Sequence, residues 1–442
     1  MTPAPVQRLC EFVDASPTAY HAVDNMAAAL EVRGAQRLDE GSAWELEPGK
    51  AYFVVRSGSA LVAFRPGLVP AAGEGFAIAG AHTDSPALKA RIEKTVAARG
   101  MERAAVEVYG GPILSTWLDR PLALAGRVVV KEADGKLRTR LLNIIRPVGI
   151  VPNLAIHLNR DLNKGFEYNA QTHLPVLLSS ELPDVGSVVT MGGGQVASKG
   201  ALLALVASEL GVDAEAIFGA DLYFVESQKA AIVGKNLVNG YRLDDLLGCH
   251  AILEAFSASK PEKHGQVACF FDNEEIGSRT VQGADSSFLR DLLGRICALG
   301  GATTEDFYRA LASSFSVSVD VAQAWNPAYP EKYDESYAPL LNGGPAVKVN
   351  ANYRYATDAE SEARFRLLCE AAAVPCQKFM SRADIAPGST IGPMSSALLG
   401  IRTVDVGSPL LSMHSIRETA GLRDHEAMSS ALARHFASSP KA

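Results

Sequence analysis

Short apolar runs that stop at acidic or histidine side chains are the feature of this sequence that most limits its fold. The run Gln266–Phe271 leads to the adjacent pair Glu274 and Glu275. The other such runs are Phe76–Gly80, which leads to His82 and Asp84, Phe315–Val319, which leads to Asp320, and Arg402–Val406, which runs on to His414. Carboxylates at the rim of a buried strand need a partner that neutralises them. We therefore expect several strands whose ends deliver ligands to one place.

The residues after about position 235 alternate between strand and helix patterns. We predict helices over 244–258, 286–299, 304–313, 358–373, 393–399 and 424–437, and strands over 266–271 and into Asp320. The first 90 residues add a helix over 5–33 broken at Ser16-Pro17, a hairpin over 52–64 and the strand into His82. Alternating strands and helices favour an α/β fold with a mostly parallel sheet flanked by helices, which carries its site at the carboxyl ends of the strands.

The stretch between residues 91 and 232 has a different character. It consists of short alternating segments such as Gly126–Val130, with Asp134-Gly135 as a turn before Leu137. This pattern predicts a β-rich insert with few long helices. We therefore divide the chain into a discontinuous catalytic domain, 1–90 and 233–442, and an inserted domain, 91–232.

Composition excludes some classes of function. The chain has 442 residues, 48% of them hydrophobic, and a net charge of −7, which argues against a nucleic-acid or anionic-membrane binder. The six cysteines form no Cys-x-x-Cys pair and are expected to be reduced thiols. The N-terminal residues lack a basic region followed by an apolar one, and no stretch is long and apolar enough to span a bilayer. We expect a cytoplasmic protein.

Each candidate ligand also has a structural alternative. His82 and Asp84 at i and i+2 could share one face of a strand, with the carboxylate orienting the imidazole, or could simply end that strand. Asp244 and Asp245 suit a helix N-terminus without any metal. Asp320 could be a turn residue and His414 a structural histidine. Glu274 and Glu275 form the strongest local signal, because one acid can bind an ion while its neighbour accepts a proton, and their structural alternative is a solvated loop.

Taken together, these side chains favour a metal-dependent hydrolase. Two histidines and three carboxylates could form the ligand set of a site for two zinc ions, with one carboxylate as a bridge. Three carboxylates and a hydroxide would offset the four positive charges of two divalent ions.

Longer motifs resemble those of the M18 family of metallopeptidases, the aspartyl aminopeptidases, over nearly the whole chain. The matching stretches are Phe12–Thr18 with His21, Gly80–Pro86, Arg242–Asp244, Asp272–Ser278, Lys348–Asn350, Gly388–Pro393, Val406–Pro409 and Met413–Glu418. Ordered motifs of this length are highly specific. The resemblance implies a zinc-exopeptidase-like fold, with the insert as a dimerisation domain, and self-association as dimers that build a tetrahedral dodecamer.

The resemblance also implies individual roles. One zinc would be held by His82, Asp244 and Asp320, and the other by Asp244, Glu275 and His414. Glu274 would be the general base, and Asp84 would orient His82. His157 would reach the site of a neighbouring subunit and help stabilise the oxyanion. Lys348 would receive the acidic side chain of the first substrate residue, although a strand-edge lysine is the alternative.

The expected activity is that of a zinc aminopeptidase which releases N-terminal Asp or Glu from peptides through a water activated by two zinc ions per subunit. Mn²⁺ or Co²⁺ could replace zinc in such a site. Two alternatives are a dinuclear zinc deacylase of small amides and a catalytically inactive assembly protein. One departure affects the pocket rim: Gln323 and Asn326 stand where many family members have histidines.

Overall fold

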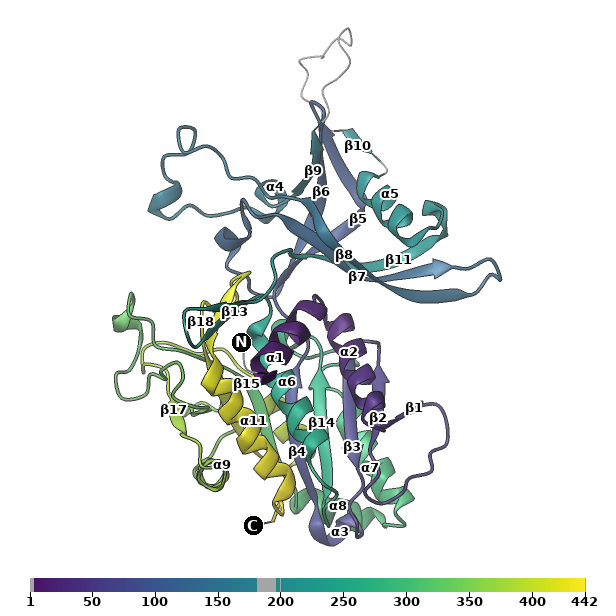
Figure 1. The fold of residues 1–442 in the computed structure, drawn as a ribbon, viewed down its shortest axis with the longest axis vertical. Coiled ribbons are helices and arrows are strands. Elements are labelled where there is room, and N and C mark those ends of the chain that lie inside the picture. The colour runs from purple at the N-terminus through teal and green to yellow at the C-terminus, as the bar shows by residue number, and fades with distance from the viewer. Residues whose placement is uncertain (1–3, 181–195, 199, 442) are drawn as a thin grey trace. The chain divides into compact units, whose positions relative to one another are not determined.

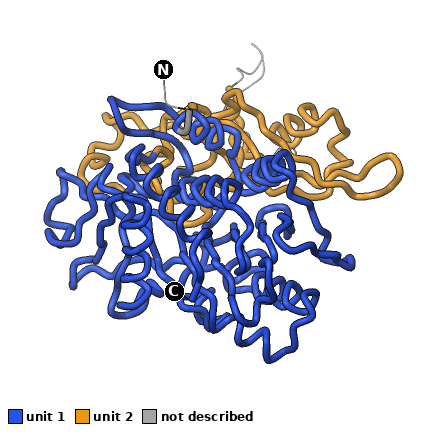
Figure 2. The backbone as a smooth tube through the Cα atoms, turned by 60° about the horizontal axis from the view of Figure 1, so that its bottom comes forward, with its two compact units in different colours: residues 1–85, 230–413, 418–442 blue, residues 86–229, 414–417 orange. Residues whose placement is uncertain are grey.

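A computed structural model describes residues 4–180, 196–198 and 200–441. The backbone forms two compact units, which are coloured separately in Figure 2. Unit 1 comprises residues 1–85, 230–413 and 418–442, and unit 2 comprises residues 86–229 and 414–417. Each unit has its own sheet and is described by itself.

Unit 1 contains a mixed sheet that has twelve strands among the described residues. The strands of its main path follow one another in the order β1 (Gln36–Leu38), β2 (Tyr52–Arg56), β3 (Ala60–Arg65), β14 (Gly265–Phe271), β4 (Phe76–His82), β15 (Phe315–Gln323), β18 (Arg402–Leu411), β19 (Glu418–Gly421), β13 (Leu237–Gly240) and β12 (Ala231–Val233). Beside this path, β16 (Ala346–Lys348) pairs with β18 and with β17 (Gln377–Phe379).

The centre of this sheet is parallel, whereas most of its margins are antiparallel. Strands β14, β4, β15 and β18 pair in parallel, and every residue of β14 and β4 is buried. Continuous burial is typical of parallel strands that are covered on both faces. The expected α/β class is confirmed, but parallel pairing covers less of the sheet than predicted. A tight turn such as the one at Gly58 joins β2 to β3, and so short a connection allows only antiparallel pairing.

Helices cover both faces of the unit 1 sheet (Figure 1). One face packs against α1 (Ala4–Ala15), α2 (Ala19–Val32), α6 (Leu243–Ala258), α9 (Ala359–Ala371) and α11 (Leu422–Ala437), and the other against α7 (Phe288–Leu299), α8 (Thr304–Ala312) and α10 (Ile391–Leu399). Alternate residues of β4 serve the two cores, because successive side chains of a strand point to opposite faces. Ala77 and Ala79 join the first core, and Phe76 and Ile78 join the second.

Most predicted elements of unit 1 are present, with one informative difference. The helical N-terminus breaks between Ala15 and Ala19, as Ser16-Pro17 predicted. The prediction that a strand ends at Asp320 was wrong, since β15 continues to Gln323. The extension forms because Val321 and Ala322 are apolar and continue the parallel pairing with β18.

Unit 2 is built on an antiparallel sheet, in agreement with its strand-rich sequence. Its described strands are β5 (Ala87–Ala98), β6 (Met101–Tyr109), β7 (Leu122–Lys131), β8 (Leu137–Gly149), β9 (Val176–Ser180), β10 (Val196–Ser198) and β11 (Ile217–Glu226). They are arranged in the order β8-β7-β11-β5-β6-β9, with β10 beside β5. Gly135 lies in the turn between β7 and β8 with φ of 78°, a backbone conformation that glycine adopts without steric cost.

Two further sequence expectations concern the whole described chain. All six cysteines are free, as predicted. Among the residues that the structure describes, none of the helices combines the length and the apolar character required to cross a membrane.

Candidate metal centre

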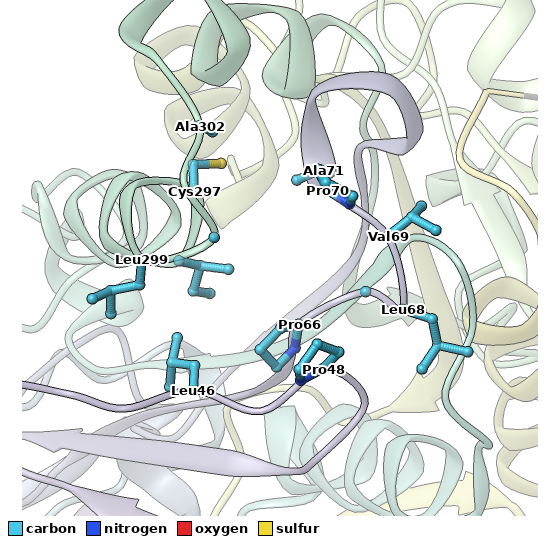
Figure 3. Close-up of a pocket in the computed structure, with 13 residues that line it drawn as sticks. Leu46, Pro48, Pro66, Leu68, Val69, Pro70, Ala71, Cys297, Leu299 and Ala302 are labelled. Carbon is cyan, nitrogen blue, oxygen red and sulfur yellow. The ribbon is translucent and has the colours of Figure 1, made fainter.

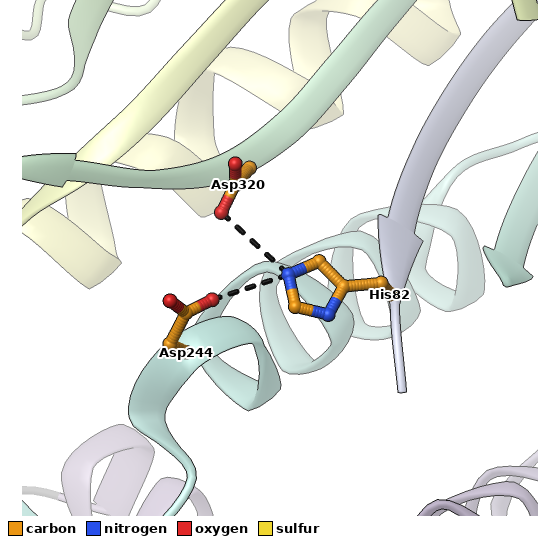
Figure 4. Close-up of side chains that lie close together, drawn as sticks. All are labelled: His82, Asp244 and Asp320. Atoms are coloured by element: carbon orange, nitrogen blue, oxygen red, sulfur yellow. Dashed lines mark ion pairs between the residues drawn. The ribbon is translucent and has the colours of Figure 1, made fainter. Parts of the chain in front are cut away.

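His82 is the last residue of β4 and faces carboxylates on both sides of its ring. Its Nε2 atom lies 3.1 Å from Oδ1 of Asp244 and 3.6 Å from Oδ1 of Asp320, as Figure 4 shows. One ligand atom from each of these three residues lies within 4.8 Å of the others. Burial alone would lower the pKa of His82, but Asp244, Asp320 and Asp84 raise it well above its usual value. The imidazole therefore sits in a strongly negative environment.

Asp84 lies beyond the end of β4 and connects His82 to the loop that carries the two glutamates. The Nδ1 atom of His82 is 3.1 Å from the backbone oxygen of Asp84 and 3.4 Å from its Oδ1. The backbone N–H groups of Glu274 and Glu275 donate to the two oxygens of the Asp84 carboxylate, at 3.0 and 3.1 Å. Asp84 therefore contacts His82 from a loop and not from a shared strand face.

Asp244 is positioned by contacts to its backbone. The residue lies at the start of α6, where φ and ψ of Asp244 and Asp245 are not yet helical and the peptide between them is cis. Its N–H donates to Glu418 at 2.9 Å, and its carbonyl oxygen accepts from the Ser85 hydroxyl at 2.6 Å. Sequence reasoning assigned no role to Ser85 or Glu418, because both act on the main chain and leave no side-chain pattern.

Glu274 and Glu275 form a single 3₁₀ turn, Glu274–Ile276, after β14. A carboxylate oxygen of Glu275 lies within 4.8 Å of one from Asp244. Burial raises the pKa of Glu274 to about 8, and the neighbouring carboxylates Asp320, Asp84 and Asp244 add to this rise. Burial, together with Asp244, also raises the pKa of Glu275 well above its usual value. Acidic side chains gathered in this way repel one another unless a cation lies between them.

Asp320 is the sixth residue of β15 and forms an ion pair with Lys348 at the end of β16. The Lys348 Nζ atom donates to Asp320 Oδ2 at 2.8 Å and to the carbonyl oxygen of Val321 at 2.9 Å. Burial would raise the pKa of Asp320, but Lys348 and His82 lower it overall. Lys348 is only 3% exposed, so it is not an ordinary strand-edge lysine. The sequence did not predict this ion pair, since β15 and β16 are separated by a long loop.

Two of the residues predicted to act at the metal centre, His414 and His157, belong to unit 2. His414 lies in the short segment 414–417, where its Nδ1 atom is 3.0 Å from the carbonyl oxygen of Gly111. A neutral ring would donate from Nδ1 to that oxygen and keep Nε2 as a possible ligand atom. His157 lies in an exposed turn, and its predicted role involves a second subunit, which one chain does not test.

Gln323 and Asn326, which stand where many family members have histidines, lie at the end of β15 and in the turn that follows it. Gln323 is the exposed last residue of β15. Asn326 caps the following turn by accepting from the N–H of Ala328 at 3.0 Å.

The donor set of the cluster fits divalent cations. Imidazole nitrogen and carboxylate oxygen are ligands that zinc accepts in proteins, and each would have to be deprotonated. His82, Asp244 and Asp320 offer one such atom each, and Asp244 and Glu275 offer a neighbouring pair of oxygens. A buried group with this excess of negative charge is a site for a cation rather than for an anionic or apolar ligand.

A separate apolar pocket of about 150 Å³ is lined by the segment that precedes β4 and by the C-terminal end of α7 (Figure 3). It is lined by Pro48, Pro66, Leu68, Pro70 and Leu299 among others, and Figure 3 shows these side chains around it. Pro70 and Ala71 precede the first residue of β4, whereas the carboxylate cluster follows its last residue. The pocket therefore plays no part in the metal centre.

Comparisons with known proteins agree with this chemistry. Residues 12–436 match the family of aminopeptidase I zinc metalloproteases, M18. A probable M18 family aminopeptidase 2 of Pseudomonas aeruginosa (strain UCBPP-PA14) is 42% identical over 436 residues, which are 98% of each chain. A probable M18 family aminopeptidase 2 of Clostridium novyi (strain NT) is 44% identical over 421 residues, covering 94% of this chain and 95% of the relative.

Solved structures show the same fold. A protein called Ape4, in complex with Nbr1, superposes with a TM-score of 0.92 at 38% identity, covering 98% of this chain and 85% of the other. Yeast aminopeptidase 1 superposes with a TM-score of 0.84 at 29% identity, covering 98% of this chain and 96% of the other. The sequence match spans nearly the whole chain, and the chain therefore belongs to the M18 family of zinc metalloaminopeptidases.

Proposed function

We propose that this aminopeptidase removes N-terminal Asp or Glu from peptides and uses two zinc ions per subunit, with Mn²⁺ or Co²⁺ as possible substitutes. The observation that carries the metal-dependent part is the contact of the buried His82 ring with Asp244 and Asp320, beside the glutamate pair. Five ligands, namely His82, Asp244, Glu275, Asp320 and His414, are proposed for the two ions. The role of His414 rests on the resemblance of its motif to the family.

The protein side chains would transfer protons and hold the catalytic groups in position. A bound pair of zinc ions would lower the pKa of a water molecule towards about 7 and polarise the peptide carbonyl. Glu274 would accept a proton from the attacking water and pass it to the departing amine. Asp84 would hold the His82 ring and, through its bonds to the N–H groups of residues 274 and 275, would fix the base relative to this ligand. His157 of a second subunit would help stabilise the oxyanion.

Lys348 would supply the preference for acidic substrates. An ammonium group has three N–H donors, and the protein uses two of them, on Asp320 and on the carbonyl oxygen of Val321. The third donor would bind the side-chain carboxylate of the substrate. Because Lys348 also holds Asp320, its replacement by Ala should lower metal affinity as well as the preference for Asp over Leu.

A substrate panel tests this function directly. The purified protein is assayed on Asp, Glu, Leu and Ala anilides, with a chelator and after addition of Zn²⁺, Mn²⁺ or Co²⁺. We expect Asp and Glu anilides to be hydrolysed fastest, the chelator to abolish activity and added metal to restore it. N-acetyl amino acids provide the matched control, because faster cleavage of these amides would support a deacylase. Faster hydrolysis of the Leu anilide would contradict the acidic preference.

We also propose that the chain self-associates through unit 2 as dimers, which assemble into a tetrahedral dodecamer in the cytoplasm. Strand β8 lies at the edge of its sheet and exposes Leu141 by 38% and Ile145 by 71%. A related structure of S. cerevisiae mApe1, with a TM-score of 0.82, is a dodecamer. Light scattering should give a mass several times that of one chain, and Ile145→Glu should reduce it. A monomeric wild-type protein would contradict this proposal.

A further inference from the structure

Two cysteines lie at the C-terminal end of α9 and in the segment that follows it. Cys369 is on the last turns of the helix and is 1% exposed. Cys376 follows the helix, directly precedes β17 and is partly exposed. The sequence predicted only reduced thiols here, because the two residues do not form a Cys-x-x-Cys pair.

The helix terminus brings the two thiols together. Ala373 has φ of 55°, the N–H of Val374 donates to the carbonyl oxygen of Cys369 at 3.0 Å, and the N–H of Ala373 donates to that of Glu370 at 3.0 Å. These two bonds define a Schellman motif, which reverses the chain at a helix end. Pro375 follows, as is common after such a terminus, and the reversed chain packs Cys376 against the apolar core cluster that contains Cys369.

The two thiols are electrostatically different. The Cys376 thiol donates to the carbonyl oxygen of Gln377 at 3.7 Å, and interaction with Cys369 lowers the pKa of Cys376 and raises that of Cys369. Arg366 lowers the pKa of Cys376 further, whereas burial and Glu362 oppose this change. Cys10, the other partly exposed cysteine, has its pKa raised by burial and by Asp14 and Glu11. A partly exposed thiol whose pKa is lowered, next to a second thiol, is the arrangement of peroxide-sensitive cysteines.

We propose that Cys376 and Cys369 form a modification site for hydroperoxides, in which Cys376 is oxidised first and Cys369 resolves it to a disulfide. The Cys376 thiolate attacks one oxygen of hydrogen peroxide, the O–O bond breaks, and hydroxide leaves to take up a proton as water. The product is a sulfenic acid on Cys376. The Cys369 sulfur then attacks the Cys376 sulfur, the S–O bond breaks, and the second water leaves with the thiol proton. The two thiols are oxidised and the peroxide is reduced.

Peptide mapping of the intact metal-loaded protein tests this proposal. No Lys or Arg lies between the two cysteines, so trypsin releases both in the single peptide 367–378, whereas Glu370 lets a glutamate-specific protease cut between them. After a stoichiometric dose of hydrogen peroxide and alkylation of free thiols, we expect this peptide to carry no alkyl group and to lack two hydrogen atoms. Glutamate-specific cleavage should leave its halves joined until a reductant is added. Cys10 should be alkylated in the same sample.

Variants separate the two roles. Cys369→Ser should stop the reaction at a Cys376 sulfenic acid, which dimedone traps, and Cys376→Ser should leave Cys369 fully alkylated. The proposal is overturned if both wild-type thiols remain alkylated, if Cys376 becomes a sulfinic acid beside an alkylated Cys369, or if Cys10 is oxidised first. The wild-type map decides the question even where a variant fails to fold. Peptidase activity does not enter the measurement, so the result is independent of the proposed function.

Discussion

Two clusters that contain buried histidines lie beside α6, and their surroundings shift the pKa values of these histidines in opposite directions. His82 contacts Asp244 at the start of the helix. Asp244, Asp320 and Asp84 raise the pKa of His82 well above its usual value, although burial opposes this rise. His250, further along α6, lies with its Nδ1 atom 2.9 Å from Nε2 of His425 on α11. Burial lowers the pKa of His250 to about 4 and that of His425 to about 3.

The comparison shows that burial alone does not identify a functional histidine. Two buried imidazoles that face each other stay neutral, and the hydrogen bond between them joins two helices. An imidazole among carboxylates stands in a field that attracts a cation. The His250–His425 pair is structural, whereas the cluster around His82 has the chemistry of a metal centre.

The sharpest test replaces one histidine from each cluster. His82→Ala should lose bound zinc and reduce kcat/KM by more than about 100-fold, since even partners outside the ligand shell are worth 10–100-fold. His425→Ala should keep its zinc and most of its activity while its thermal stability falls. Metal content by mass spectrometry and anilide hydrolysis check both variants. Equal zinc loss in the two variants would remove the distinction between the clusters.

Glu274→Gln tests the chemistry within the metal cluster. The amide keeps the size of the side chain but accepts no proton, so kcat should fall by about 10²- to 10⁴-fold with zinc content unchanged. Glu262→Gln, on the surface of the same unit, serves as the matched control and should behave as wild type. Undiminished turnover at full zinc occupancy would exclude Glu274 as the base.

Acid should weaken the histidine pair. Because the folded-state pKa of His425 is about 3, below its ordinary value of 6.5, the unfolded chain binds protons first as the pH falls. The stabilisation is present above pH 6.5 and is lost on acidification, by about 3 kcal/mol at pH 4.5 from this residue. Urea unfolding at pH 7 and pH 4.5 measures it. Between pH 7 and pH 4.5, the free energy of unfolding of His425→Gln should fall by about 3 kcal/mol less than that of the wild type. An identical pH dependence in the two proteins would contradict a lowered pKa of His425.

Metal removal should have the smallest effect on the free energy of unfolding, and this effect should come only from the cluster around His82. At a free zinc concentration about ten times Kd, the bound ion stabilises the folded state by about 1.4 kcal/mol. A chelator should therefore lower the midpoint of urea unfolding in the wild type and in His425→Gln alike. Glu275→Ala should respond less, because it lacks one proposed ligand. A midpoint that is insensitive to chelator would argue against a metal bound to the folded chain.

The sequence predicted much of the framework of the site. Apolar runs that end at polar residues placed His82 and the glutamate pair at the ends of β4 and β14, where the structure has them. Alternation of strands and helices gave the α/β class. These features are local, so they can be read from neighbouring residues.

What the sequence could not predict depends on contacts between distant segments. The pairing of Val321 with Ser408 extends β15 past Asp320, and the pairing of β16 with β18 brings Lys348 to Asp320. The contact between His250 and His425 likewise depends on how α6 and α11 pack. The antiparallel margins of the sheet follow from short connections, whose effect is clear only once the central strand order is known.

The bonds from Asp84 to the glutamate loop have a practical consequence for enzyme engineering. The loop is anchored through amide hydrogens, which every residue except proline possesses. Side chains at positions 274 and 275 can therefore be exchanged across the whole range of polar chemistry without removing the anchor, and a saturation library there would report on reactivity rather than on misplacement of the loop.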